Sequence, residues 1–417
     1  MKNFFSRYLV CIVILILIAV SVFPGGKQDK AGAAVVSVDI YHRWGGKHQE
    51  LMQQMIEHFN AKTPNIHASE VSVSGGLWEE LEAKTLAQIA AGEEPPAIMV
   101  PGYYLVEHNV KTFDAVRLDK LGGKEAESVF DTYPPAILRL AQVNGVQYGL
   151  PFALSNPVFF YNADLFKKVG LDPKDPPSTW QETKEIGRII KENTDVAPLY
   201  INAADSWYMQ ALIASNGGDF LRDGRPTLNS PEAVEAMKIW RGFYDEGIIP
   251  KITYREATES FQAEKMAMQG NSITLFQGFA ERVASLDTAK MPAFGDHVRR
   301  LPPGGGPLVI LARSDEKRTA AWELAKYMVS KEAMNIWVRT GYISPLDPAK
   351  VAIETDHRQD PAYEQLQYMI PWVNWPGPNS LEIEKVICDW RDKMLYGEVE
   401  IKKGCDELQK AVLDLIP

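Results

Sequence analysis

The sequence predicts an α/β protein made of two domains. The chain has 417 residues, more than the roughly 250–300 that usually share one hydrophobic core, so a division into domains is expected. Strand patterns and helix patterns alternate between Val35 and Val100, which is typical of a parallel sheet covered by helices. The run Pro302–Gly306 has the composition of a flexible crossing between two lobes.

Apolar spacing places the N-terminal elements in order. Strands are expected where apolar residues alternate or form a short run, and helices where they recur every three or four residues, as at Leu51, Met55 and Phe59. The expected elements are strand Val35–Tyr41, helix Lys47–Lys62, strand Ile66–Val73, helix Trp78–Ala91 and strand Ala97–Val100.

Helix caps help to place the later elements. Ser178 and Gln181 predict a capping box that opens a helix ending at Lys191. Ser230 before Pro231 predicts the cap of the following helix. The other expected elements are strand Val158–Tyr161, helix Ala233–Asp245, strand Leu308–Ala312, a helix from the Ser314 cap to Val329, and helix Lys331–Arg339.

Two further helices are expected at the C-terminal end, Leu381–Leu395 and Ile401–Leu415, joined at Gly397. Cys388 and Cys405 lie nine residues before Gly397 and eight after it, so an antiparallel hairpin would place them opposite each other. A disulfide and a pair of buried thiols are both compatible with this spacing.

The first residues have the anatomy of a secretory signal peptide. Lys2 and Arg7 precede the apolar run Tyr8–Phe23, which is shorter than the roughly 20 residues that a bilayer crossing needs. We expect a signal peptide over residues 1–25, with cleavage as late as residue 33, and an uncleaved anchor as the alternative. Cys11 stands near the start of this apolar run and follows the bulky pair Leu9-Val10, so a lipid anchor is not expected. The predicted location is therefore periplasmic or extracytoplasmic.

Composition and motifs argue against several functions. The chain carries 44 basic and 54 acidic residues, a net charge of −10, which disfavours nucleic acid and anionic lipid as partners. It contains no nucleophile elbow and no phosphate loop, and its seven histidines are not paired at helical spacing, so no metal and no cofactor are expected. We predict a protein that is not an enzyme. An exported carbohydrate-active enzyme with two placed carboxylates is the alternative from another class, and a sensor subunit is a further one.

Aromatic residues stand in loops, several of them directly after predicted strands. A sugar ring has an apolar face and a polar rim, so flat aromatic rings and Asp, Glu, Asn or Arg side chains suit it. Loops at the carboxyl ends of parallel strands are where such contacts gather. Packing between loops is the alternative for any one residue, but the set predicts contact with a sugar: Trp44, Trp78, Tyr103, Tyr104, Trp207, Tyr208, Tyr342, Trp372 and Trp375.

A central block carries a resemblance to a known family. Its pieces are Pro151-Phe152, Ser155-Asn156-Pro157-Val158, Tyr161-Asn162, Gly170-Leu171-Asp172-Pro173 and Pro176-Pro177-Ser178-Thr179-Trp180, followed later by Thr340-Gly341-Tyr342. With these motifs the chain resembles the extracellular solute-binding proteins of family 1, which serve ATP-binding-cassette (ABC) importers. Within that family it looks most like the sugar and glycerol-3-phosphate branch.

The resemblance implies a two-lobed periplasmic-binding-protein fold of type II. Each lobe would be a mostly parallel sheet with flanking helices, with the ligand cleft between the lobes. Residues 36–152 and 307–345 would form lobe 1, and residues 153–303 and 346–417 lobe 2. Such a protein would capture a carbohydrate by lobe closure and deliver it to membrane permease subunits, acting as a monomer.

The resemblance also implies which residues contact the ligand. Family contacts match Trp78, Tyr103, Ser155, Trp207, Ser272, Gly305 or Gly306, and Tyr342, and Trp44 joins them as a loop aromatic. The glycerol-3-phosphate branch has an acidic residue at Tyr103, and its phosphate-facing arginine falls at Glu384 or Lys385. Glu384 would repel a phosphate, whereas Lys385 could hold one. We therefore expect a neutral mono- or oligosaccharide, with glycerol-3-phosphate or a glycerophosphodiester as the alternative.

Overall fold

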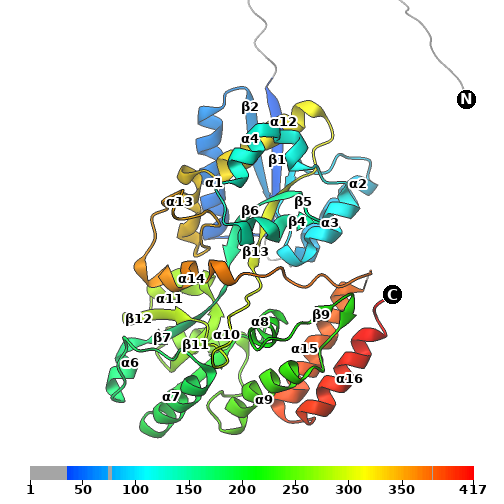
Figure 1. The fold of residues 1–417 in the computed structure, drawn as a ribbon. Coiled ribbons are helices and arrows are strands. Elements are labelled where there is room, and N and C mark those ends of the chain that lie inside the picture. The colour runs from blue at the N-terminus through cyan, green and yellow to red at the C-terminus, as the bar shows by residue number, and fades with distance from the viewer. Residues whose placement is uncertain (1–34, 74–77, 378) are drawn as a thin grey trace, which may run out of the picture. The chain divides into compact units, whose positions relative to one another are not determined.

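The protein is described by a computed structural model that covers residues 35–73, 78–377 and 379–417 (Figure 1). Residues Val35–Pro417 form one compact unit. The predicted signal peptide, residues 1–25, lies outside the described residues. Among the helices of the described part, none combines the length and the apolar character that crossing a membrane requires.

The first sheet has five strands in the order β2-β1-β3-β13-β6, and we call it and its helices the first lobe (Figure 1). Strand β1 is parallel to β2 and β3, whereas β13 is antiparallel to β3 and β6. The strands are β1 (Val36–His42), β2 (Ile66–Ser72), β3 (Ile98–Met99), β6 (Gly149–Ser155) and β13 (Gly304–Ile310). The helices are α1 (Lys47–Lys62), α2 (Trp78–Ala90), α3 (Val106–Phe113), α4 (Leu118–Phe130), α5 (Pro135–Leu138), α12 (Asp315–Met328) and α13 (Lys331–Trp337), beside the hairpin β4 (Gln142–Val143) and β5 (Val146–Gln147).

The second sheet has four strands in the order β12-β7-β11-β8, and we call it and its helices the second lobe (Figure 1). Strand β7 is antiparallel to β11 and β12, and only β8 and β11 are parallel. The strands are β7 (Pro157–Asn162), β8 (Ala197–Ile201), β11 (Met266–Ser272) and β12 (Leu286–Lys290). The other elements are α6 (Ala163–Lys168), α7 (Trp180–Asn193), α8 (Trp207–Ser215), α9 (Pro231–Asp245), α10 (Tyr254–Gln262), α11 (Phe276–Ala280), α14 (Asp360–Glu364), α15 (Ser380–Tyr396) and α16 (Ile401–Leu413), with the small hairpin β9 (Leu221–Arg222) and β10 (Arg225–Pro226).

The α/β class is confirmed, and most strands of each sheet run in the same direction. Both sheets are nevertheless mixed, because each contains one strand that runs against its two neighbours, β13 in the first lobe and β7 in the second. Strands β6 and β13 come from distant parts of the chain and complete a sheet that the parallel strands β1, β2 and β3 begin. Sequence alternation identifies a strand but does not give its direction.

The predicted crossing at Pro302–Gly306 is only partly irregular. Gly304, Gly305 and Gly306 are the first residues of β13 and pair with Ser155, Leu154 and Ala153. Glycine is required here, because Gly305 has φ +98° and a Cβ on it would meet the carbonyl oxygen of Ala153. The glycines thus allow two backbones to approach closely, rather than giving a free hinge.

The predicted caps are close to the observed ones. Helix α7 begins one residue later than expected, with a capping box of Thr179 and Glu182 in place of Ser178 and Gln181. Thr179 has the extended backbone that a cap needs, and its side chain accepts a hydrogen bond from the Glu182 N–H. Ser178 has another role, donating its backbone N–H and its hydroxyl to the Glu182 carboxylate.

The C-terminal hairpin is present as α15 and α16, but its cysteines are not joined. The Sγ atom of Cys405 is 3.7 Å from the sulfur of Met394 between the two helices. Cys388 instead lies beside Glu384 and Arg391 on its own helix. The thiols therefore face different surroundings, and of the two arrangements allowed by the spacing the structure has the free thiols.

Candidate ligand-binding site

A cavity of about 680 Å³ is lined by residues from both lobes. This volume lies within the range of about 300–1,000 Å³ that is usual for small-molecule sites. The first-lobe wall, as we define it, consists of Arg43, Trp78, Glu79 and Tyr104. The second-lobe wall consists of Asn202, Asp205, Trp207, Tyr254, Asn271, Trp372, Trp375 and Glu384. Residues at or near the crossings also line the cavity: Ser155, Ser272, Thr274, Gly304, Gly305 and Tyr342.

The first-lobe wall is held together by contacts among its own side chains. The guanidinium carbon of Arg43, in the loop after β1, lies 4.5 Å from the centroid of the Trp78 ring. The hydroxyl of Tyr104 donates a hydrogen bond to the Glu79 carboxylate. Burial, and then the negative charge of Glu79, raise the pKa of Tyr104, so this hydroxyl remains a donor.

The second-lobe wall includes the N-terminus of α8, where the donors of Ser206 and Trp207 are already engaged. The Ser206 N–H and hydroxyl each donate to a different oxygen of the Glu384 carboxylate, both at 2.7 Å. The Trp207 N–H donates to Oδ1 of Asp205 at 3.0 Å. Because a helix N-terminus attracts anions, these two carboxylates occupy the position where a phosphate or carboxylate ligand would otherwise bind.

Arg391 supports this loop from within the second lobe. Its side chain is buried, and it donates hydrogen bonds to the carbonyl oxygens of Ala203 at 2.7 Å and Asp205 at 2.5 Å. Burial, and then the charge of Glu384, raise the pKa of Asp205 to about 6. Two carboxylates are therefore held close together beside the cavity.

Flat aromatic surfaces complete the second-lobe wall. The indole N–H of Trp207 donates to the carbonyl oxygen of Pro302 at 3.1 Å, which fixes the orientation of the ring. The ring of Trp372 is nearly parallel to it, with centroids 6.4 Å apart and an interplanar angle of 25°. Tyr104 of the first-lobe wall lies 5.2 Å from Trp372, so aromatic rings of the two walls meet.

Asn271 provides a hydrogen-bonding group without a protein partner. The residue is fully buried at the end of β11 and lines the cavity. Its Nδ2 makes no hydrogen bond with any residue that the structure describes. A buried amide donor of this kind favours a ligand that brings an acceptor such as a hydroxyl or carbonyl oxygen.

Seven of the nine predicted site residues line the cavity: Trp78, Ser155, Trp207, Ser272, Gly305, Tyr342 and Glu384. Trp44 and Tyr103 do not, because both point into the core of the first lobe. The indole N–H of Trp44 donates to the Tyr342 hydroxyl at 3.2 Å, behind the cavity surface. The neighbouring residues Arg43 and Tyr104 line it instead.

Both candidates for the phosphate-facing position line the cavity, but they differ in their partners. Glu384 is bound by Ser206 at the N-terminus of α8. The ammonium of Lys385 lies 3.1 Å from the Asp389 carboxylate, and its side chain is 78% exposed. Glu384 is therefore the residue that sets the charge inside the cavity.

Several lining residues were absent from the predicted site, among them Arg43, Glu79, Asp205 and Asn271. Three of these lie next to a residue that sequence reasoning did select, namely Trp44, Trp78 and Ser272. The selection favoured aromatic rings and missed charged residues next to them. Including the polar neighbours of every loop aromatic would have found Arg43 and Glu79, but not Asp205 or Asn271.

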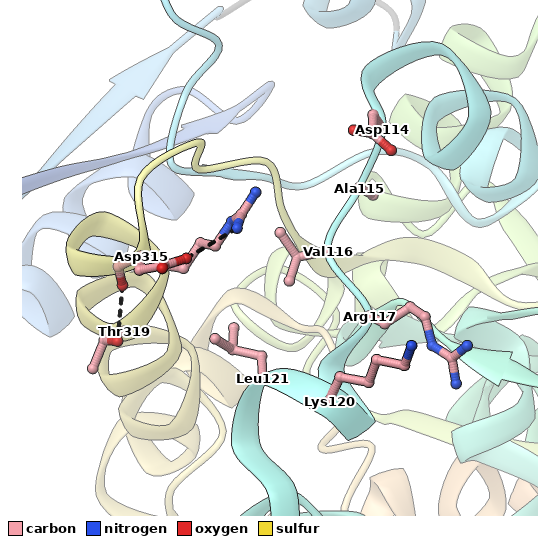
Figure 2. Close-up of a pocket in the computed structure, with 9 residues that line it drawn as sticks. Asp114, Ala115, Val116, Arg117, Lys120, Leu121, Asp315 and Thr319 are labelled. Carbon is pink, nitrogen blue, oxygen red and sulfur yellow. Dashed lines mark hydrogen bonds and ion pairs between the residues drawn. The ribbon is translucent and has the colours of Figure 1, made fainter.

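A second hollow of about 480 Å³ lies entirely in the first lobe, between the start of α4 and the start of α12 (Figure 2). Figure 2 shows Val116 and Leu121 between the charged side chains of Arg117 and Lys120 and that of Asp315. It has no aromatic residue and no contribution from the second lobe. The larger cavity therefore remains the candidate ligand site.

Within the described residues, no group of three or more His, Cys, Asp and Glu side chains is placed to hold a metal ion.

Comparisons with known proteins agree with this architecture. The family described as bacterial extracellular solute-binding protein matches residues 54–364. The sn-glycerol-3-phosphate-binding periplasmic protein of Brucella abortus (strain 2308) is 23% identical, covering 94% of this chain and 97% of the relative.

Two crystal structures share the fold. The cyclic alpha-maltosyl-1,6-maltose binding protein of Arthrobacter globiformis has a TM-score of 0.79 at 23% identity, covering 91% of this chain and 98% of that one. The structure of UgpB from Mycobacterium tuberculosis in complex with glycerophosphocholine has a TM-score of 0.77 at 20% identity, covering 90% and 97%. These neighbours confirm the two-lobed fold. With the family match covering most of its length, the chain belongs to the bacterial extracellular solute-binding proteins of ABC transporters, which are binding proteins and not enzymes.

Proposed function

We propose that the protein is the substrate-binding subunit of an ABC importer for a carbohydrate, either a monosaccharide or an oligosaccharide. One observation carries the proposal: a single cavity combines flat rings of Trp207, Trp372 and Tyr104 with carboxylate and amide groups of both lobes. Rings cover the apolar faces of a sugar, and carboxylates and amides bind its hydroxyl groups. We propose as ligand contacts the predicted residues that line the cavity, together with Arg43, Glu79, Asp205 and Asn271.

The position of Glu384 argues against a phosphate ligand. Its carboxylate already accepts hydrogen bonds from Ser206 at the N-terminus of α8. A phosphate there would lose these donors and meet a like charge close by. The carbohydrate therefore fits the cavity better than a glycerol phosphate does.

A glycerol-3-phosphate or glycerophosphodiester ligand is the second candidate. Lys385 and Arg43 line the cavity and are cations that could meet a phosphate. The relative named as a glycerol-3-phosphate-binding protein and the neighbour in complex with glycerophosphocholine support this alternative. Both cations already have partners, Asp389 for Lys385 and the Trp78 ring for Arg43.

We further propose an extracytoplasmic protein that acts as a monomer and delivers its ligand to permease subunits. The family description and the predicted signal over residues 1–25 support this location. The lobes would be residues 36–152 with 307–345 and residues 153–303 with 346–417. A ligand that contacts both walls would favour the closed arrangement, because only then are all contacts made.

The test is a thermal-shift screen of the protein against maltose, cellobiose, longer oligosaccharides, glycerol-3-phosphate and glycerophosphocholine, followed by titration calorimetry. A specific ligand raises the unfolding midpoint in a concentration-dependent way. We expect a carbohydrate to do so. If only phosphate compounds raised the midpoint, the second candidate would replace the first; if nothing did, the carbohydrate class would be wrong while membership of the family would stand.

A further inference from the structure

The cavity holds more negative than positive charge. Three carboxylates line it, those of Glu79, Asp205 and Glu384, against the two cations Arg43 and Lys385. Lys385 does not balance this charge, because it is largely exposed and pairs with Asp389, which does not line the cavity. Among the residues that line the cavity, Arg43 is therefore the main cation facing three acids, while Arg391, buried behind the second-lobe wall, also offsets part of the charge of Asp205.

All three carboxylates line the same cavity, and Asp205 and Glu384 are close enough to act on each other. Glu79 accepts the hydroxyl of Tyr104, and the charges of both Glu79 and Glu384 act on that phenol and help to raise its pKa. Glu384 and Asp205 accept from consecutive residues, Ser206 and Trp207. Carboxylates of both walls therefore face the same cavity.

Two carboxylate oxygens have no assigned role in the protein. Glu79 accepts the Tyr104 hydroxyl on one oxygen only, and Asp205 accepts the Trp207 N–H on one oxygen only. The other oxygen of each makes no hydrogen bond with a residue that the structure describes. Asn271 is fully buried, lines the same cavity, and has an Nδ2 without a partner among those residues. The cavity therefore offers a ligand two charged acceptors, on Glu79 and Asp205, and one buried neutral donor, on Asn271.

We propose that the carbohydrate carries a protonated amino group, which the carboxylates of Glu79 and Asp205 bind, while Asn271 donates to a hydroxyl or ring oxygen. The proposal rests on the carbohydrate function above and specifies its substrate class. An ammonium has three donors and no acceptor, so it can satisfy both free carboxylate oxygens at once. A neutral sugar would leave the excess negative charge uncompensated in a partly desolvated cavity. Aromatic rings such as those of Tyr104 and Trp372 line the same cavity and also favour a cation.

The first experiment compares sugars that differ only in this group. Glucose, glucosamine and N-acetylglucosamine form one series, the galactose counterparts a second, and cellobiose, the disaccharide of glucosamine and diacetylchitobiose a third. Each is titrated calorimetrically at neutral pH and low salt. In a series that binds, we expect the free amine to bind about tenfold more tightly than both the hydroxyl and the N-acetyl sugar, as a charged hydrogen bond would give. Added salt should reduce this difference.

Two substitutions test whether the Glu79 carboxylate itself, and not a general loss of negative charge on α2, gives the preference for the amine. Glu79→Gln should weaken binding of the amine about tenfold more than binding of the hydroxyl sugar, and so remove most of the preference for the amine. Glu80→Gln is the matched control, because Glu80 is the next residue of α2, is exposed and does not line the cavity. The unfolding midpoint of each unliganded variant shows whether folding is intact.

The outcomes distinguish the amino-sugar inference from the carbohydrate function on which it rests. If a hydroxyl or N-acetyl sugar bound as tightly as the amine, the amino-sugar inference would be wrong and the carbohydrate function would stand. If Glu79→Gln and Glu80→Gln kept the same preference for the amine, the assigned carboxylate would be wrong. If no sugar of these series or of the broader screen bound, both proposals would be overturned.

Discussion

The two walls of the cavity are built in different ways. Side chains of the first-lobe wall pair with each other, Arg43 with Trp78 and Tyr104 with Glu79. In the second-lobe wall, backbone donors of α8 hold Glu384 and Asp205, and Arg391 holds the backbone of the same loop. The first wall can change partners by rotating side chains, whereas the second can change only if the lobe itself rearranges.

Burial of the two helices explains this difference. All nine residues of α8 are buried, so the helix is held firmly by the surrounding lobe. Helix α2 buries only Trp78, Leu81 and Thr85, and it exposes Leu86 and Ile89. We infer that the second-lobe wall is formed before ligand arrives and that the first-lobe wall adjusts to it, which reduces the entropy lost on binding.

The largest expected effect comes from removing the support of the second-lobe wall. Arg391→Ala should lower the free energy of unfolding by about 3 kcal/mol, because it leaves buried carbonyl oxygens without their charged donor. Urea denaturation monitored by tryptophan fluorescence measures this. Lys393→Ala, an exposed position on the same helix, is the control. Equal losses for the two variants would show that Arg391 does not anchor the wall.

Removing the Trp207 ring from the second-lobe wall should affect ligand binding more than folding. Trp207→Ala should weaken affinity by about 1–3 kcal/mol, the usual cost of truncating a buried aromatic contact. Calorimetry with the sugar that gives the largest thermal shift is the measurement. Trp390→Ala, on α15 but outside the cavity lining, should leave affinity unchanged. Unchanged affinity of Trp207→Ala would remove Trp207 from the site.

The difference in burial between helices also explains which of them the sequence could predict. Helices α15 and α16 were predicted because one face of each is apolar, and α1 for the same reason. Helix α8 was not predicted, since a helix that is buried all round has no periodic pattern, and Trp207 was read as a loop residue. The loop aromatics gave the position of the site. Whether Trp44 or Arg43 faces the cavity depends on how the loop after β1 turns, which spacing does not encode.

A smaller effect is expected from the first-lobe wall. Tyr104→Phe removes one hydrogen bond to Glu79, and affinity should fall by about 1 kcal/mol or less, since Glu79 can accept from ligand or water instead. The same titration measures it, with Tyr148→Phe as a control in the same lobe away from the cavity. A loss as large as that of Trp207→Ala would show that this wall is as rigidly organised as the other, contrary to our comparison.

The last expected effect is a dependence of stability on pH that originates in the second-lobe wall. Burial, and then Glu384, raise the pKa of Asp205 from 3.8 to about 6. The charges of Glu384, Arg391 and Arg43 act on the Asp205 carboxylate. Its own charge acts on the titratable side chains of Tyr254 and Cys388. Between these two pKa values the folded state binds a proton that the unfolded state does not, so this stabilisation is present at low pH and is lost as the pH rises through about 6.

Asp205→Asn removes the titrating group and should flatten this part of the profile of unfolding midpoint against pH, whereas Asp195→Asn, an exposed position in the same lobe, should not. A profile of Asp205→Asn that matched the parent protein would mean that the carboxylate is as well hydrated as in the unfolded chain. The second-lobe wall would then be open to water and free to adjust, like the first. A flattened profile would instead support a wall whose charges are fixed by the fold before any ligand binds.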